Sequence, residues 1–249
     1  MLEVDRVGKR FGANEVLAQI TLRMRAGEFV AVVGASGCGK STLLRLIAGL
    51  DNPSEGRILL DGGPLTGPSS KVGVVFQEPR LMPWLKLTDN VAFGLPRQLS
   101  RRERRRLAEA ALGRVGLARF TAALPKTLSG GMAQRAAIAR ALVTRPPVLL
   151  LDEPFSAVDA LTRQALQEEL LRLWAEDRPT MLLVTHDLDE ALYLADRVIV
   201  LGSHPGRVRL DLEVPLPRPR PRDGVALAEL RARLFAELPH GPVDLAPAA

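Results

Sequence analysis

The sequence predicts an α/β fold in which a mostly parallel sheet carries a small antiparallel β subdomain and an inserted helical subdomain. Three continuous aliphatic runs, typical of buried parallel strands, end near residues 34, 152 and 186, and helical patterns follow them. Two early segments instead alternate apolar and polar residues, as strands of a half-buried antiparallel sheet do. The stretch from about 85 to 142 has helical spacing, which predicts the insertion.

The expected elements follow in chain order. Residues 2–7 and 16–25 are alternating strands, and 28–34 is a buried strand whose final glycine leads into a helix over 41–50. A turn with a short strand over 53–62 and a strand over 71–77 precede the helical block, in which 101–117 is clearly amphipathic. Strands are then expected over 148–152, 180–186, 196–201 and 206–214, with helices over 161–176 and 188–195. We expect one domain over 1–214, with its helical subdomain at about 85–142, and a proline-rich linker with a C-terminal helix over 215–249.

The composition limits the classes of function. The chain has 249 residues, of which 47% are hydrophobic, and its single cysteine excludes an internal disulfide. No run approaches the roughly 18 apolar residues that span a bilayer, so we expect a soluble chain that meets a membrane only at its surface or through a partner. The net charge of +6 includes arginine clusters at 101–106 and 215–222 that contain no aromatic residues. They are typical of a solvated helix face and an extended linker, so we expect no nucleic-acid partner.

Residues 34–42, "GASGCGKST", match the phosphate-binding pattern G-x-x-x-x-G-K-[ST], with a buried strand before them and a helix after them. The glycines let backbone amides turn toward phosphate oxygens, and the helix dipole adds positive potential. Lys40 should reach the β- and γ-phosphates, and Ser41 should bind Mg²⁺ through its hydroxyl. This predicts a P-loop NTPase core with ATP and Mg²⁺ as cofactors. The candidate nucleotide-binding residues are Gly34, Ala35, Ser36, Gly37, Cys38, Gly39, Lys40, Ser41 and Thr42.

Polar side chains at the ends of three further strands supply the candidate catalytic and metal-binding groups. Asp152 is expected to hold Mg²⁺ through water, and Glu153 to polarise the attacking water as general base. Gln77 ends the expected strand "KVGVVFQ" and can bond a metal-bound water without adding charge. His186 ends "LLVTH", where strand ends face the ligand crevice, and we expect it to contact the γ-phosphate. The catalytic candidates are Glu153, His186 and Gln77, and the metal candidates are Ser41, Gln77 and Asp152.

Two residues keep alternative interpretations open. Phe11 either belongs to the core or stacks on adenine, which contributes ~1–3 kcal/mol in comparable stacks. Cys38 either is a small residue that fits the phosphate loop or, near a helix N-terminus, has a lowered thiol pKa. In the second case alkylation would block ATP binding and Mg-ATP would protect the thiol.

The order of the motifs resembles the ATP-binding subunits of ABC transporters over about residues 2–210. The phosphate loop, Gln77, "LSGGM" at 128–132, "LLLDEP" at 149–154, "SAVDA" at 156–160 and His186 occur in that family's order. The resemblance implies a homodimer with ATP between the two copies, in which Ser129, Gly130 and Gly131 contact the nucleotide held by the other copy. Asp159 would lie at the dimer interface. ATP binding would close the dimer and hydrolysis would open it, which drives a membrane permease.

A finer resemblance links residues 76–84, "FQEPRLMPW", and the C-terminal tail to the nitrate, sulfonate and taurine importers, and most of all to their sulfonate-importing branch. It implies a peripheral ATPase at the cytoplasmic face of the inner membrane. Its partners would be two permease subunits and, indirectly, a periplasmic substrate-binding protein. Taurine and nitrate remain alternative substrates, and an exporter ATPase or a soluble ATP-driven clamp on nucleic acid or ribosomes remains an alternative class.

The loop after Gln77 has two interpretations. Leu81, Met82 and Trp84 either form an apolar docking patch for the permease or only cover the helical block.

Met132 departs from the family pattern, which usually has glutamine there. Backbone amides and Ser129 would still bind the anion, so we expect the chemistry to survive. The methionine lacks hydrogen bonds that help to fix the loop. We therefore predict a modest loss of nucleotide-driven dimerisation that Met132→Gln corrects.

Overall fold

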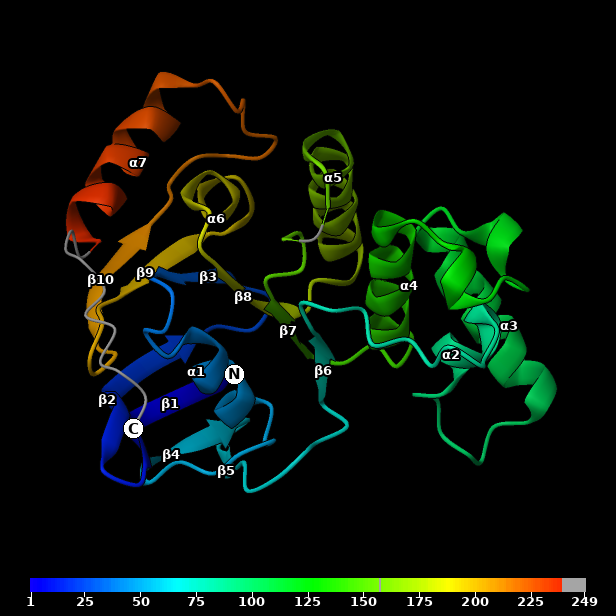
Figure 1. Ribbon diagram of the computed structural model, residues 1–249, viewed down its shortest axis with the longest axis horizontal. Coiled ribbons are helices and arrows are strands. Elements are labelled where there is room, and N and C mark those ends of the chain that lie inside the picture. The colour runs from blue at the N-terminus through cyan, green and yellow to red at the C-terminus, as the bar shows by residue number, and fades with distance from the viewer. Residues whose placement is uncertain (157, 239–249) are drawn as a thin grey trace.

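The computed structural model describes residues 1–156 and 158–238, which form two sheets and their covering helices (Figure 1). The large sheet has the strand order β10-β9-β3-β8-β7-β6, and only β10 runs antiparallel to its neighbour. Its strands are β3 (Phe29–Gly34), β6 (Val72–Val75), β7 (Val148–Asp152), β8 (Thr180–Thr185), β9 (Arg197–Leu201) and β10 (Val208–Glu213). The predicted mostly parallel sheet is confirmed, and the carboxyl ends of β3, β6, β7 and β8 share one edge.

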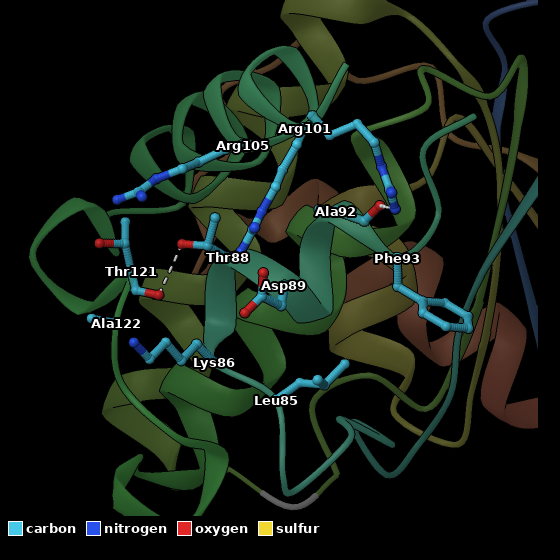
Figure 2. A pocket seen from close by; sticks show the side chains of 11 residues that line it. Leu85, Lys86, Thr88, Asp89, Ala92, Phe93, Arg101, Arg105, Thr121 and Ala122 are labelled. Atoms are coloured by element: carbon cyan, nitrogen blue, oxygen red, sulfur yellow. Dashed lines mark hydrogen bonds between the residues drawn. The ribbon is translucent and has the colours of Figure 1, made fainter. Parts of the chain in front are cut away.

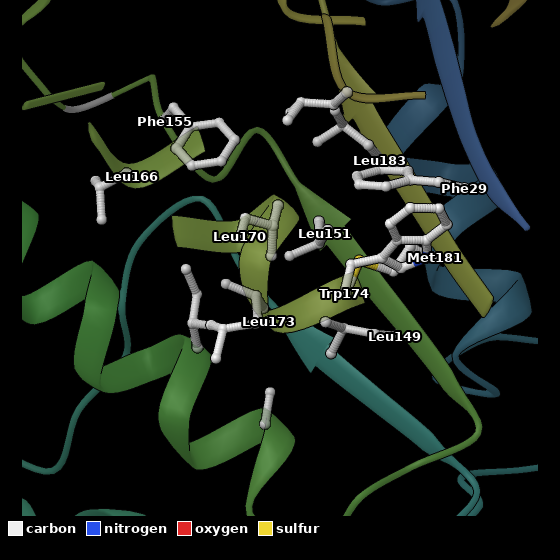
Figure 3. Packing of buried hydrophobic residues seen from close by; sticks show 14 of the residues in the cluster. Phe29, Leu149, Leu151, Phe155, Leu166, Leu170, Leu173, Trp174, Met181 and Leu183 are labelled. Atoms are coloured by element: carbon white, nitrogen blue, oxygen red, sulfur yellow. The ribbon is translucent and has the colours of Figure 1, made fainter. Parts of the chain in front are cut away.

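Side chains alternate between two separate cores because successive residues of a strand face opposite sides of the sheet. In β3, Phe29, Ala31 and Val33 join the core below α5 (Ala160–Asp177) and α6 (Leu188–Leu194). The intervening valines join a second core with α1 (Lys40–Ile47) and the smaller sheet. Figure 3 shows the first core, where the rings of Phe29 and Trp174 lie 6.0 Å apart. Both faces are covered, which explains why the strands read as continuous apolar runs.

The predicted antiparallel subdomain is a four-stranded sheet with the order β2-β1-β4-β5. Its strands are β1 (Leu2–Phe11), β2 (Asn14–Met24), β4 (Glu55–Leu60) and β5 (Gly63–Pro64). The first two extend beyond the predicted ranges because they form a hairpin that pairs as far as Phe11 and Asn14. A bridge between Leu17 and Gly206 connects this sheet to the loop before β10.

The helical insertion lies to one side of the large sheet (Figure 1). It contains α2 (Leu87–Ala92), α3 (Arg101–Arg114), two 3-10 turns (Ala118–Phe120 and Pro125–Thr127) and α4 (Gly130–Leu142). Ser100 caps α3 by accepting a hydrogen bond from the backbone amide of Glu103 at 3.2 Å. These helices fall within the predicted range 85–142.

The tail after β10 packs on the domain. Arg220 is 4% exposed and donates to the carbonyl oxygens of Leu192 (2.6 Å) and Ala195 (2.7 Å). It thereby satisfies carbonyls that the end of α6 leaves unpaired. We call residues 215–222 the strap, because this segment contains no helix or strand and is bound to the domain.

The predicted C-terminal helix is present as α7 (Val225–Glu237), which buries Leu227 and Leu234. The predicted domain boundary at residue 214 stays a prediction, and residues 239–249 lie outside the described part of the chain. None of the helices in the described ranges is long and apolar enough to cross a membrane.

Candidate functional site

The phosphate loop connects β3 to α1, in the context that its sequence predicts. Gly39 precedes α1 with a φ of 98°, and a Cβ on it would lie 2.5 Å from the Leu17 side chain. Only glycine tolerates both the left-handed backbone and this contact. The loop thus places the N-terminus of α1, with its unpaired amides, at the carboxyl edge of the sheet.

Lys40 folds back over the loop. Its Nζ donates to the carbonyl oxygens of Gly34 (2.8 Å) and Ala35 (2.9 Å), and the residue is only 6% exposed. Among the described residues no carboxylate lies within ion-pair distance of this ammonium group. Its positive charge is therefore available to an anion bound by the loop.

Ser41 and Asp152 meet across the strand edge. The Ser41 hydroxyl donates to Oδ1 of Asp152 at 3.0 Å, although the two residues are 111 positions apart. Burial raises the pKa of Asp152, and the hydrogen bond from Ser41 opposes that rise. A hydroxyl and a carboxylate are hard oxygen donors of the kind that Mg²⁺ prefers, so these residues fit the predicted metal.

Glu153 and His186 form the second close pair of predicted residues. Oε2 of Glu153 lies 3.2 Å from Nδ1 of His186. The pair forms because β7 and β8 are parallel neighbours, with Asp152 opposite Val184. Glu153 itself has a φ of 42°, and its backbone amide donates to the Val184 carbonyl at 2.9 Å. This left-handed residue turns the chain away from β7 and leaves its carboxylate at the strand edge.

Gln77 is exposed two residues after β6, at the same edge of the sheet. No described hydrogen bond joins it to Ser41 or Asp152. The loop that follows is held from two sides. The guanidinium of Arg140 donates to the carbonyls of Pro79 (2.8 Å) and Arg80 (2.7 Å).

Asn90, which is fully buried, is the second anchor of this loop. Its side chain accepts from the Met82 amide at 2.8 Å and donates to the carbonyls of Met82 (3.1 Å) and Leu85 (2.9 Å). Sequence reasoning missed Arg140 and Asn90. The available signal was Asn90, a polar residue at a position of α2 that faces the core, and the sequence does not show which groups it binds.

The loop residues divide between the two predicted interpretations. Leu81 packs against the hydrophobic core, whereas Trp84 is 74% exposed. Leu81 therefore fits the interpretation that the loop covers the core, and Trp84 fits the interpretation that the loop offers an exposed apolar surface.

The segment 129–131 starts α4, away from the phosphate loop of the same chain. Ser129 caps the helix by accepting from the amide of Met132 at 3.3 Å. A Cβ on Gly131 would lie 2.6 Å from Cγ2 of Thr162, so this glycine allows α4 to approach the start of α5. No described hydrogen bond joins residues 129–131 to residues 34–42. Asp159 caps α5 by accepting from the Thr162 amide at 3.1 Å.

The structure excludes one of the two interpretations for Phe11 and one for Cys38. Phe11 is 52% exposed, with the Lys9 ammonium 4.8 Å from its ring centroid, so it is not a core residue. For Cys38, the alternative of a lowered thiol pKa is wrong. Burial raises the pKa of this thiol, because the side chain is 1% exposed, and the nearby Lys40 only opposes the rise. Cys38 is therefore the small residue that fits the loop.

Comparison with known proteins gives a consistent set of relatives. A model of the family described as ABC transporter matches residues 17–156. The chain is 53% identical to the aliphatic sulfonates import ATP-binding protein SsuB 2 of Burkholderia cenocepacia, over 94% of this chain and 86% of that protein. It is 45% identical to the aliphatic sulfonates import ATP-binding protein SsuB of Bacillus thuringiensis, over 96% of each chain.

Solved structures agree with the fold. The dimeric post-hydrolysis state of the ATP-binding cassette MJ0796, bound to ADP and Pi, is 34% identical with a TM-score of 0.76, and the match covers 87% of this chain and all of that chain. The cbiO1 structure from Clostridium perfringens, part of the ABC transporter complex cbiONQ, is 31% identical with a TM-score of 0.77, over 86% of this chain and 88% of that chain. The predicted arrangement of a mostly parallel sheet, an antiparallel β subdomain and a helical insertion is thus confirmed.

Proposed function

The chain belongs to the ABC transporter ATP-binding proteins, and from this premise we propose that it is the ATP-hydrolysing subunit that powers import of aliphatic sulfonates through a separate permease. The observation that carries the substrate class is the 53% identity, over 94% of the chain, to a sulfonate import protein. Taurine and nitrate are the alternative substrates. The ATPase activity itself follows from the family.

The geometry of the strand edge supports specific roles. Lys40 and the amides at the start of α1 would bind the phosphates, with Ser41 and Asp152 as the Mg²⁺ ligands, Asp152 through water, and Gln77 bonding a metal-bound water. The bound ion would neutralise phosphate charge and hold the leaving group in place. Glu153 would accept a proton from the attacking water, and His186 would orient this carboxylate and contact the γ-phosphate. The supporting observation is that both pairs are preformed at hydrogen-bond distance.

The position of Ser129, Gly130 and Gly131 supports a site shared between two copies. The exposed Ser129 and Gly130 lie at the N-terminus of α4, and no described hydrogen bond joins them to the phosphate loop of the same chain. In a head-to-tail homodimer this helix end would meet the nucleotide bound by the other copy. Asp159, exposed at the start of α5, would then lie at the interface. Phe11, exposed beside the loop that leads to β2, would stack on the adenine ring.

A pocket on the helical insertion is the surface that we assign to the permease. It has a volume of about 620 Å³ and lies between α2, α3 and residues 121–122 (Figure 2). Leu85, Ala92 and Phe93 give it apolar walls. Its charged lining is mostly cationic and consists of Lys86, Arg101, Arg104 and Arg105 with one carboxylate, Asp89. A permease segment with an apolar side chain and an acidic group would complement this surface. Trp84 is exposed and comes directly before Leu85, which lines the pocket. The predicted docking loop is therefore continuous in sequence with the pocket lining.

Deletion of this ATPase and growth on an alkanesulfonate as sole sulfur source would test the proposal. We expect the wild-type chain to restore growth, Glu153→Gln to fail, and growth on sulfate to be unaffected. Loss of growth only on taurine, or only on nitrate as nitrogen source, would reassign the substrate. Unimpaired growth on all three would overturn the importer role for small anions.

Co-purification would test the partners and the location. We expect the chain at the cytoplasmic face of the inner membrane, bound to two permease subunits that recruit a periplasmic binding protein. Charge reversal by Arg101→Glu should reduce membrane association without changing ATP affinity. Recovery with nucleic acid or ribosomes instead of membranes would favour the soluble-clamp alternative.

A further inference from the structure

The turn that carries His186 is built from side chains around one hydroxyl group. The Thr185 Oγ1 accepts a hydrogen bond from the backbone amide of Asp187 at 3.1 Å. The same hydroxyl donates to Oε2 of Glu190 at 2.7 Å. His186 lies in the chain between Thr185 and Asp187, so the bond from the Asp187 amide to the Thr185 hydroxyl closes the turn around His186.

Glu190 is an unusual residue for its position. It is 5% exposed on α6, a helix whose other buried residues are aliphatic apart from Tyr193, and its Oε1 has no hydrogen-bond partner among the described residues. Burying a carboxyl group in this way costs free energy that an apolar side chain would not. A role outside stability is therefore the simplest reason for an acid here.

Charged groups from several elements lie near Glu190. They are Asp187 ahead of α6, Arg163 on α5, Glu153 after β7, and Asp189, Arg222, Asp223 and Arg231 around the same cavity. Arg163 also lies 3.7 Å from Asp187 and donates to the Val158 carbonyl at 3.2 Å. The carboxyl group of Glu190 thus lies inside a network that includes both the His186 turn and the start of α5.

We propose that Glu190 is a positioning residue, which holds the His186 turn through Thr185 so that the imidazole stays against the carboxylate of Glu153. The role rests on the proposed ATP hydrolysis, since it concerns the geometry of that site. Loss of the Thr185–Glu190 bond would leave the turn free to shift, and small displacements of a catalytic group cost large factors in rate. ATP binding would be affected little, because neither side chain belongs to the phosphate loop.

The test compares variants of the full-length chain in steady-state ATP hydrolysis. Glu190→Leu removes the acceptor, Thr185→Val removes the donor, and Asp189→Asn, an exposed neighbour paired with Arg231 at 3.1 Å, is the matched control. We expect kcat to fall about tenfold or more in the first two, with KM for ATP within about twofold, and no change in the control. Thr185→Val also removes the acceptor of the Asp187 amide, so it should be the slower single variant. The double variant should be no slower than Thr185→Val, because the bond that Glu190→Leu breaks is already absent there.

A pH profile separates positioning from loss of folding. Burial, together with the carboxylates of Asp187 and Glu153, raises the pKa of Glu190 to about 7, against the opposing effects of Thr185 and Arg163. Glu190→Gln keeps an acceptor oxygen and should retain most of kcat. The ratio of the wild-type kcat to the Glu190→Gln kcat should change with pH through one ionisation near 7. The kcat profile of Asp189→Asn should keep the ionisation seen in the wild type.

Two results would overturn the inference. One is a kcat of Glu190→Leu and Thr185→Val equal to that of the wild type. The other is multiplicative losses in the double variant together with a Glu190→Gln pH profile that matches the wild type. Absence of Mg-dependent ATP hydrolysis in the wild-type chain would instead count against the proposed function.

Discussion

Replacing Glu190 with glutamine should change how the stability of the protein depends on pH. The pKa of Glu190 is raised from an ordinary 4.5 to about 7 in the folded state, chiefly by burial. Between these two values the folded protein binds more protons than the unfolded chain, so the free energy of unfolding falls as pH rises. At about 1.4 kcal/mol for each tenfold change in proton affinity, the full effect is about 3 kcal/mol.

Urea unfolding from pH 4.5 to pH 8 measures this effect. Glutamine does not titrate, so the free energy of unfolding of Glu190→Gln relative to the wild type should increase by about 3 kcal/mol across the range, and most of the change should occur before pH 7. Asp189→Asn should give a curve parallel to that of the wild type, because Asp189 is exposed. Parallel curves for Glu190→Gln as well would falsify the reasoning, since they would mean that the buried carboxyl has an ordinary pKa.

The remaining predictions concern the shared site, the departure at Met132 and the strap. Ser129→Arg should leave ATP binding by the monomer nearly intact and abolish hydrolysis, as nucleotide titration and phosphate release would report; undiminished hydrolysis would exclude a site shared between copies. Met132→Gln should modestly strengthen ATP-driven dimerisation in a Glu153→Gln background, and unchanged dimerisation by light scattering would reject that idea. Arg220→Ala should lower the free energy of unfolding by about 2–4 kcal/mol, because it leaves buried carbonyls of α6 unpaired, while the exposed Arg231→Ala should change it by under about 1 kcal/mol. Equal denaturation midpoints would show that the strap contributes nothing to stability.

The sequence alone determined the fold class and the location of the strand-edge groups. Buried parallel strands need apolar side chains on both faces, so β3, β7 and β8 are visible as continuous runs in the sequence. In a parallel sheet the carboxyl ends of these strands share one edge. The sequence therefore predicts that the phosphate loop, Asp152 and His186 lie together. The bounds of β1 and β2 were predicted less well, because their pairing in a hairpin extends both strands beyond the residues that alternate between apolar and polar.

Only the tertiary structure decided the features that depend on contacts distant in sequence. Cys38 is buried by packing around the phosphate loop. This burial raises its thiol pKa and outweighs the local effect of the helix N-terminus, which would lower it. The sequence of the strap predicts an extended linker, yet Arg220 is buried because the end of α6 offers unpaired carbonyls. Glu190 gave no motif signal, and the role proposed for it rests on its hydrogen bond to Thr185, the neighbour of His186. Sequence patterns record which face of an element is buried, whereas burial depth, pKa and hydrogen-bond partners are set by neighbours that the chain brings together only on folding.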